Sequence, residues 1–206
     1  MNVNPSTLEW QNAYKLIVGS ILPRPIALVS SIDEEGVTNI APFSFFTAIC
    51  ADPFLVCFSP MRRGSDGSKK DTLINIEETK QFVINIVSED IVEKMNIAAT
   101  DFEQHVDEFV EAGFTKEKSL VVVPPRVKES KVQLECSLHE VLHFGDKPGA
   151  GSLVIGKVEM VHIDDDIYYE GKIDTKKLNP VGRMTGNLYT RSTTDMFELI
   201  RKTTRG

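Results

Sequence analysis

The chain has 206 residues, of which 41% are hydrophobic and 26% are charged, and its formal net charge is -7. This composition is ordinary for a globular protein, and the length favours one domain over residues 1–206. The acidic balance argues against a general nucleic-acid binder, which needs a basic face. No apolar run reaches the roughly 18–20 residues of a membrane span, and the N-terminal residues lack a signal-peptide pattern. We therefore expect a cytoplasmic protein that binds neither nucleic acid nor membrane.

The cysteine and histidine patterns point away from disulfides and metals. Cys50, Cys57 and Cys136 form no CxxC motif and cannot all pair with one another, as is typical of reduced thiols in a cytoplasm. His139 and His143 are four residues apart and would share a face of a helix, but the period of their segment favours a strand. No metal site is expected.

The first half of the chain alternates between helical and strand patterns. Residues 6–18 have the apolar spacing of an amphipathic helix, with Ser6 or Thr7 as its N-cap. Apolar, β-branched runs predict strands over 25–32, 37–41, 54–59 and 81–87. Two further helices are expected over 71–80, with Asp71 or Thr72 as cap, and over 88–99, with Ser88 as cap.

The second half predicts one long hairpin. Residues 126–144 and 152–163 read as strands, and the glycine- and proline-rich segment 145–151 between them predicts a turn. Residues 101–119 suggest a short helix and a loop, and residues 178–190 look irregular. Because hairpins rather than crossover helices join the strands, we expect a mainly β protein with appended helices, either an antiparallel barrel or a sandwich.

Three segments are candidates for a binding site. "SPMRRGSDGSKKDT", residues 59–72, combines cations, hydroxyls and the start of a helix, which suits a phosphate; the alternative is a solvated basic loop. "TNIAPFSFF", residues 38–46, interrupts a strand with Pro42. Unpaired backbone groups there can meet a planar heterocycle, or the segment is a β-bulge whose Asn39 and Ser44 are satisfied internally.

The third candidate is "NPVGRMTGNLYTR", residues 179–191, which is either a loop that closes over a ligand or a plain surface loop. Nucleophilic catalysis finds no support, because GxSxG and Cys–His signatures are absent, and no GxGxxG indicates a dinucleotide fold. We therefore name no catalytic residue. Any redox chemistry has to come from a bound cofactor.

Seven landmarks stand in one order between residues 14 and 195. They are "PRPIALVSSIDEEGVTNIAPFSFF", "ADPFLVCFSP", "KKDTLINI", "VDEFVEAGFT", "KESKVQLECSLHEV", "LVIGKVEMVHID" and "LNPVGRMTGNLYT". Together they resemble the flavin reductase-like family with its FMN-binding split β-barrel. The resemblance implies an antiparallel Greek-key split β-barrel that binds FMN and works as a homodimer, with FMN near the subunit interface.

The resemblance also implies site residues. The flavin ring would lie along residues 39–45, and the loop 59–72 would hold the ribityl chain and the phosphate. The implied cofactor-binding residues are Asn39, Ala41, Pro42, Phe43, Ser44, Phe45, Ser59, Pro60, Arg62, Lys70, Asp71, Thr72, Arg183 and Tyr189. Whether Arg62 or Arg63 points inward is left open. Arg24 is weighed equally as a flavin contact and as a tie for a strand end, and Thr185 stands where relatives often have glycine.

The function implied is an oxidoreductase in which NAD(P)H reduces bound FMN by hydride transfer to N5. The electrons then pass to a small-molecule or protein acceptor, and a cation from Arg183 or Lys70 near N1 would favour the reduced flavin. The alternative is a non-enzymatic FMN electron carrier of the flavoredoxin type. A third possibility is a relative that has lost its flavin, against which the intact basic loop argues.

Overall fold

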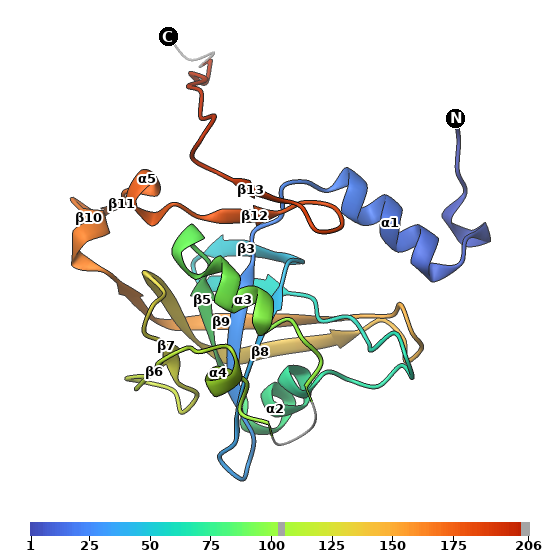
Figure 1. The fold of residues 1–206 in the computed structure, drawn as a ribbon, viewed down its shortest axis with the longest axis horizontal. Coiled ribbons are helices and arrows are strands. Elements are labelled where there is room, and N and C mark those ends of the chain that lie inside the picture. The colour runs from blue at the N-terminus through green and yellow to red at the C-terminus, as the bar shows by residue number, and fades with distance from the viewer. Residues whose placement is uncertain (103–105, 203–206) are drawn as a thin grey trace.

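The computed structural model describes residues 1–102 and 106–202. Its body is one seven-stranded sheet in the order β2-β1-β5-β8-β9-β4-β3, and all neighbouring strands run antiparallel (Figure 1). The strands are β1 (Ala27–Ile32), β2 (Thr38–Phe43), β3 (Phe46–Ala51), β4 (Phe54–Phe58), β5 (Gln81–Ile86), β8 (Val132–His143) and β9 (Ser152–Ile163). The mainly β architecture with hairpin connections is as predicted.

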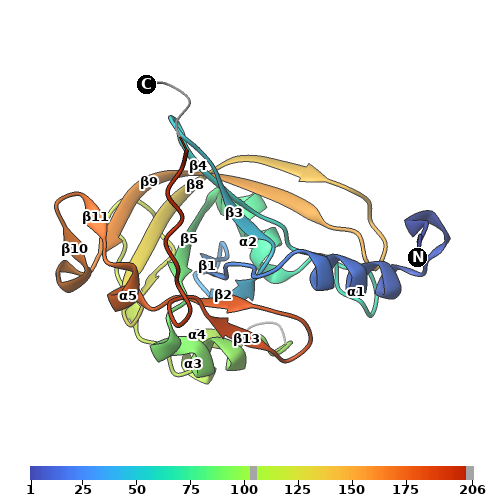
Figure 2. The same cartoon turned by 90° about the horizontal axis from the view of Figure 1, so that it is seen from above.

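The long hairpin of β8 and β9 forms the centre of the sheet, as its glycine-rich turn predicts. Each strand has 12 residues, and the register shifts near Glu135/Cys136 and Leu138/Glu140. Such irregularities bend a strand and increase its twist. Figure 2 shows the result: β8 and β9 curve around one side of the molecule, whereas α3 and α4 lie on the other side. Residues 126–127, expected in the same strand as β8, form the separate short strand β7 (Arg126–Val127).

Strand β1 is buried on both faces, so it separates two hydrophobic cores. Ala27 and Val29 belong to the first core, which also contains residues of β4, β5, β8, β9 and α2 (Asp71–Thr79). Leu28 belongs to the second core, which contains residues of α3 (Val92–Ile97) and α4 (Glu108–Glu111). Alternate side chains of a strand point to opposite faces, which explains the division. The second core fixes α3 and α4 beside β2.

The proline that interrupts the 38–60 segment lies on an edge strand. Strand β2 pairs only with β1, and Pro42 stands opposite Leu28. An edge position tolerates a residue without a backbone N–H, because no second strand needs that donor. The chain bends at Ser44 and Phe45 and returns as β3, whereas the bulge considered for this segment lies further on, between Ala48 and Cys50. The open edge of β2 is available to the site described below.

The N-termini of the helices differ from the predicted caps, and α1 and α3 also start later than expected. Helix α1 (Trp10–Ser20) has Glu9 as N-cap, because Pro5–Thr7 form a separate 3-10 turn that includes both predicted cap residues. Helix α2 has Lys70 at its N-cap position without a side-chain cap, so neither Asp71 nor Thr72 is the cap. A 3-10 turn at Glu89–Ile91 precedes α3, and the hydroxyl of Ser88 caps nothing.

The segment 178–190, expected to be irregular, contains a short hairpin. It consists of β12 (Val181–Arg183) and β13 (Tyr189–Arg191), and it follows α5 (Thr175–Leu178). The prediction missed this hairpin because each strand has only three residues. Arg183 stacks on Tyr189 across the two strands. The other small sheets are β6 (Lys116–Glu117) with β7, and β10 (Tyr168–Tyr169) with β11 (Lys172–Ile173). The last 3-10 turn is Asp165–Ile167.

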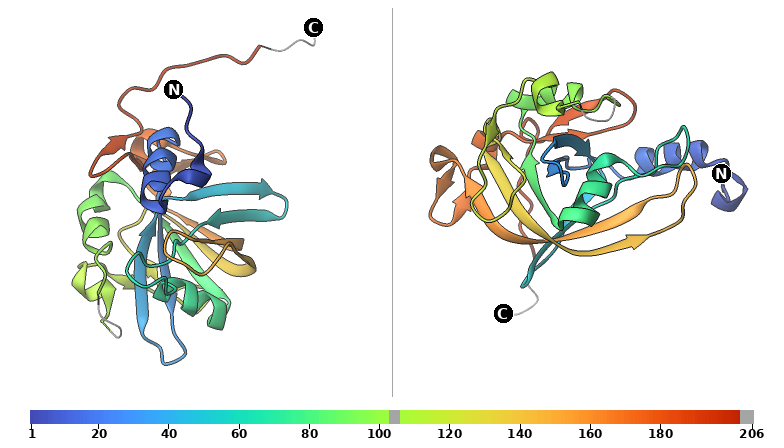
Figure 3. Two further views of the ribbon diagram at one scale, coloured as in Figure 1. Left: turned by 90° about the vertical axis from the view of Figure 1, so that its right-hand side faces the viewer. Right: turned by 90° about the horizontal axis from the view of Figure 1, so that it is seen from below.

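Two parts of the chain project from the body. The hairpin of β3 and β4 extends outwards, and the chain after β13 leaves the globule, as Figure 3 shows. Strand β3, which was not predicted from the sequence, is largely exposed. Within residues 1–102 and 106–202, no helix has the length and apolar character needed to cross a membrane.

Candidate functional site

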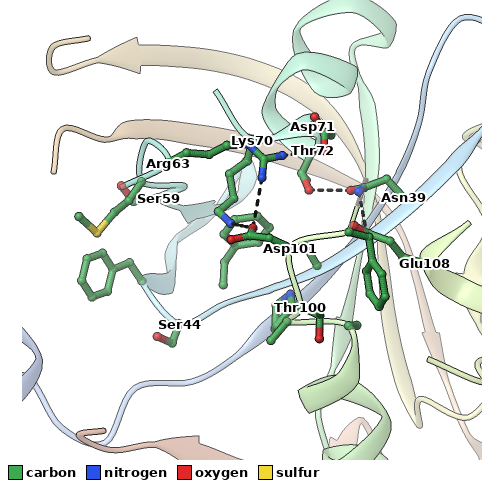
Figure 4. Close-up of a pocket in the computed structure, with 18 of the residues that line it drawn as sticks. Asn39, Ser44, Ser59, Arg63, Lys70, Asp71, Thr72, Thr100, Asp101 and Glu108 are labelled. Atoms are coloured by element: carbon green, nitrogen blue, oxygen red, sulfur yellow. Dashed lines mark hydrogen bonds and ion pairs between the residues drawn. The ribbon is translucent and has the colours of Figure 1, made fainter. Parts of the chain in front are cut away.

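A cavity of about 230 Å³ opens beside the β2–β3 bend. Its walls come from β2, the loop before α2, the first turn of α2, the segment after α3, and α4 (Figure 4). One end carries charged side chains, and the other carries aromatic ones, among them Tyr14, Phe45 and Phe102. The cavity therefore combines a polar end with an apolar, aromatic end.

The charged end is built around two cations. Arg63 Nη2 lies 2.8 Å from Asp71 Oδ2, and Arg63 Nη1 lies 3.2 Å from Asp101 Oδ1. Lys70 Nζ reaches the same Asp101 oxygen at 3.0 Å, and this hydrogen bond is the main cause that lowers the pKa of Asp101. The two cations thus converge at the N-terminus of α2.

The start of α2 offers further donors for an anion. Its N-cap Lys70 makes no side-chain cap, although the first turn of a helix has N–H groups without an intrahelical partner. These N–H groups and the positive end of the helix dipole favour an anion, and the hydroxyls of Ser59 and Thr72 line the same cavity. These donors line one cavity, so the arrangement favours a phosphate site over the alternative of a solvated basic loop.

The structure places Arg63, and not Arg62, on the cavity. Arg62 donates from Nη1 to Gly67 O at 3.2 Å, and its backbone N donates to Ala150 O at 2.9 Å. Met61 forms a β-bridge with Gly151, so the chain is extended here, and Met61 and Arg63 face the cavity while Arg62 faces away. Of the two arginines, Arg63 therefore lines the cavity, and the expected Arg62 does not.

A chain of hydrogen bonds joins the start of α2 to α4 through β2. Thr72 Oγ1 donates to Asn39 Oδ1 at 2.7 Å, and Asn39 Nδ2 donates to Glu108 Oε2 at 2.8 Å. The backbone N of Ile40 donates to the same Glu108 oxygen at 2.8 Å. The amide of Asn39 is thus satisfied internally, as the alternative for this segment predicted, and it still lines the cavity.

Glu108 is the one carboxyl of this chain of bonds, and its side chain is buried. Only 8% of the residue is exposed, and desolvation raises the pKa of Glu108 to about 7, with nearby Asp71 adding to the rise. The hydrogen bond from Ile40 and the charges of Lys70 and Arg63 oppose this shift. Glu108 therefore changes charge near neutral pH at the wall of the cavity.

Arg24 supports the aromatic end from below. Its guanidinium donates to Val18 O at 3.0 Å, to Ile21 O at 2.8 Å and to Met184 O at 2.8 Å. It also contacts Ser44 Oγ at 3.4 Å and lies under the ring of Phe45, 5.9 Å from its centroid. Arg24 is 5% exposed and does not line the cavity, so its role is to tie down chain segments.

Most of the predicted site residues meet in this one cavity. Those that line it are Asn39, Ala41, Pro42, Phe43, Ser44, Phe45, Ser59, Lys70, Asp71 and Thr72. Pro60 does not line it, and its carbonyl accepts a hydrogen bond from Ser152 N. Arg183 and Tyr189 do not line it either, because they stack on each other in the β12–β13 hairpin, with 4.5 Å from Arg183 Cζ to the ring centroid.

Sequence reasoning missed the wall between α3 and α4. The residues of this wall are Ala98, Ala99, Thr100, Asp101, Phe102 and Glu108. Glu108 belongs to the landmark "VDEFVEAGFT", but that motif does not show which of its acidic residues is buried. Tyr14 and Met61 were also missed. His105, one of the four histidines, lies outside the described residues.

The geometry supports ligand binding more than acid–base or nucleophilic chemistry. Two hydroxyls on the cavity already donate within the protein, that of Ser59 to Ser152 O at 2.8 Å and that of Thr72 to Asn39 Oδ1 at 2.7 Å. The described residues contain no group of three or more His, Cys, Asp or Glu that could hold a metal ion. A ligand with a phosphate at one end and a planar aromatic system at the other fits the donors and the aromatic walls.

Comparison with known proteins agrees with this geometry. The family model of the flavin reductase like domain matches residues 18–177. Nitrilotriacetate monooxygenase component B from Bacillus cereus is 36% identical with a TM-score of 0.91, covering 97% of this chain and 98% of that one. The 2-nitrobenzoate 2-nitroreductase of Pseudomonas fluorescens is 33% identical with a TM-score of 0.87, covering 99% and 98%.

A third solved structure bears on the fold alone. A protein with a split barrel domain from Shewanella frigidimarina is 23% identical with a TM-score of 0.82, covering 98% of this chain and 100% of that one. The antiparallel split β-barrel predicted by resemblance is thus confirmed.

Proposed function

The chain belongs to the flavin reductase-like family, and from this premise we propose that it is an FMN-dependent oxidoreductase that uses NAD(P)H. The observation that carries the proposal is the cavity itself, with a cationic end at the start of α2 and an aromatic end at the β2–β3 bend. Two similar solved structures above 30% identity are a monooxygenase component and a nitroreductase, which favours an enzyme.

Residues at the two ends have different tasks in this proposal. Lys70, Arg63 and the first turn of α2 would hold the phosphate of FMN. The hydroxyls of Ser59 and Thr72 donate to Ser152 O and Asn39 Oδ1, so they would have to turn from these acceptors to donate to the phosphate. The bend at Ser44 and Phe45 would lie along the flavin ring. Asn39 is held by Thr72 and Glu108, so the wall beside the ring is already ordered before ligand binds.

Bound FMN would supply the redox chemistry, taking a hydride from NAD(P)H and passing the electrons to a small-molecule or protein acceptor. The protein has to position the ring and exclude water. Acid–base residues are not required for a hydride transfer, which agrees with a cavity whose hydroxyl and amide groups are engaged in structural hydrogen bonds.

A homodimer forms part of the proposal. Strand β3 is an edge of the sheet, and the apolar side chains of Ile49 on β3 and Phe54 on β4 are exposed. Exposed edges with apolar side chains favour pairing with another chain. A second copy would also bring its residues 181–189, including Arg183 and Tyr189, towards the flavin. Sedimentation velocity should show a species of twice the mass of the chain, and a monomer at micromolar concentration would contradict this part.

The experiment that tests the proposed function is anaerobic reduction of the FMN-loaded protein. The absorbance spectrum is recorded with FMN, and NADH or NADPH is then added in separate stopped-flow runs. Rapid bleaching of bound flavin by either nucleotide is expected, and it would identify the donor. Three unpaired cysteines, one of them exposed, favour a cytoplasmic location, where both donors occur.

Bleaching by dithionite but by neither nucleotide would contradict the reductase and favour an electron carrier of the flavoredoxin type. Absence of any bound-flavin spectrum would contradict both functions, since both depend on the same cavity.

A further inference from the structure

One acidic side chain faces both cations of the cavity from its exposed side. Asp101 Oδ1 lies 3.0 Å from Lys70 Nζ and 3.2 Å from Arg63 Nη1. Its side chain is 70% exposed, whereas those of Lys70 and Arg63 are 34% and 23% exposed. In Figure 4 it points towards both cations at the charged end of the cavity. A phosphate that entered the cavity would need the same donors.

We propose that Asp101 is an internal competitor of the phosphate, which engages the donors of Lys70 and Arg63 until the ligand displaces it. This inference rests on the proposed function, because it assigns the FMN phosphate to these two cations. Asp101 then determines how tightly the phosphate is held.

The two acidic partners of Arg63 differ in a way that supports this role. Asp71 is the first residue of α2 and accepts from Nη2 at 2.8 Å, so it holds the guanidinium by one edge. Asp101 takes Nη1, and it comes from the segment after α3 rather than from the loop that carries the cations. Displacement of Asp101 would free Nη1 and Lys70 Nζ, while Asp71 keeps Arg63 in place.

The balance of charges also indicates that Asp101 competes with the phosphate. The positive charges of Arg63 and Lys70 are matched by the negative charges of Asp71 and Asp101 before any ligand binds. A phosphate monoester brings about −1.5 to −2 at neutral pH, so binding beside an unchanged Asp101 places like charges together. The competition lowers the affinity for FMN and speeds its release. The flavin of this chain would therefore exchange with solution instead of being held permanently.

The rival role for Asp101 is to hold the two cations in position for the phosphate. The two roles predict opposite signs. Removal of the competing charge tightens FMN binding if Asp101 competes, and it weakens FMN binding if Asp101 only positions Lys70 and Arg63. Riboflavin, which lacks the phosphate, should respond to neither change.

The test compares Asp101→Asn with the matched variant Glu77→Gln. Glu77 also pairs with a lysine of this loop, Lys69, and lies 3.0 Å from His143 Nε2, but it does not line the cavity. Both variants remove one negative charge. Dissociation constants for FMN and riboflavin are measured by flavin fluorescence quenching at one pH and one salt concentration, with FMN release rates by stopped flow.

We expect Asp101→Asn to bind FMN about tenfold more tightly and to release it more slowly, with riboflavin unchanged, because one nearby like charge is removed. Glu77→Gln should change neither constant. Unchanged or weaker FMN binding by a folded Asp101→Asn variant would overturn the proposal, as would an equal gain in Glu77→Gln. Asp101→Ser, which removes the charge without adding an amide, serves as the second variant and should show the same gain.

Failure of the proposed phosphate site and failure of the role of Asp101 give different binding results. Equal affinity of the wild-type protein for FMN and riboflavin would remove the phosphate from Lys70 and Arg63, and the role of Asp101 would be overturned with it. A wild-type preference for FMN that Asp101→Asn does not strengthen would overturn only the role of Asp101.

Discussion

The two ends of the cavity are built in different ways. At the charged end, Lys70, Arg63 and Asp101 are partly exposed and joined by ion pairs, which are individually weak in water. Arg24 beneath the aromatic end and Glu108 on the wall formed by β2 and α4 are nearly buried, and they hold the chain through hydrogen bonds to backbone groups and Asn39. The charged end can therefore rearrange when a ligand binds, whereas the aromatic end and the β2 wall are fixed beforehand.

This difference suits a ligand with two unlike parts. A flexible phosphate tail can be caught by adjustable cations, but a rigid ring needs a wall that does not move, because reactive geometry depends on small displacements. The predictions below separate the two ends: changes at the fixed end should appear in folding stability, and changes at the charged end in ligand affinity.

The largest effect is expected for Arg24→Ala. The substitution leaves the carbonyls of Val18, Ile21 and Met184 without their donor, so the free energy of unfolding should fall by about 4 kcal/mol. Urea denaturation measures it, and Arg24→Lys should recover only part of the loss because an ammonium cannot reach all three carbonyls. A loss below about 1 kcal/mol would mean that Arg24 is not a structural tie.

The second effect is a pH dependence at Glu108. Its folded-state pKa is about 7, above the ordinary 4.5, so its contribution to stability is complete below pH 4.5 and is lost as the pH rises through 7. Glu108→Gln cannot ionise. Relative to the wild type, its free energy of unfolding should therefore rise by up to about 3 kcal/mol between pH 4.5 and pH 8.

Urea midpoints at both pH values measure this difference. The exposed residue Glu111 lies on the same helix, so Glu111→Gln controls for net charge and should keep the wild-type pH profile. If the free energy of unfolding of Glu108→Gln and of the wild type changed with pH in parallel, burial would not raise the pKa of Glu108.

The third effect concerns affinity at the charged end. Lys70→Ala removes a cation from the proposed phosphate site, so FMN affinity should fall about 100-fold while riboflavin affinity stays nearly constant. Lys69→Ala is the matched control, because Lys69 pairs with Glu77 and does not line the cavity. Equal losses for both flavins on Lys70→Ala would exclude the phosphate from this lysine.

The smallest effect separates the two neighbouring arginines. Arg63→Ala should weaken FMN binding about tenfold, because Arg63 faces the cavity but is partly neutralised by Asp71. Arg62→Ala should change FMN affinity less than about twofold, since its guanidinium donates to Gly67 O. Titration of both variants with FMN measures the difference, and the reverse order would restore Arg62 as the ligand.

The wall formed by β2, the loop before α2 and the start of α2 was largely predictable from the sequence, because local patterns determine it. Pro42 indicates an edge strand, the turn 145–151 indicates the central hairpin, and the basic loop before α2 supplies the residues that line the charged end of the cavity. Even the choice between Arg62 and Arg63 follows from the alternation of side chains, once the chain at Met61 is known to be extended.

The wall between α3 and α4 was not predictable from the sequence, because tertiary packing creates it. Glu108 is buried only because α4 packs on β2, and nothing local distinguishes it from the neighbouring Asp107, which caps the helix by accepting from Phe109 N. Asp101 meets Lys70 across 31 positions of sequence, a pairing that no periodicity reveals. The short β12–β13 hairpin was missed for a different reason, because its strands are too short to show a period.

The most direct test of the account is a crystal structure of the protein with FMN. It should show the phosphate at the N-terminus of α2, within hydrogen-bonding distance of Lys70 and Arg63, Asp101 moved away from both cations, and the ring along Asn39–Phe45. Flavin bound elsewhere, or in this cavity with its phosphate away from Lys70 and Arg63, would contradict the account.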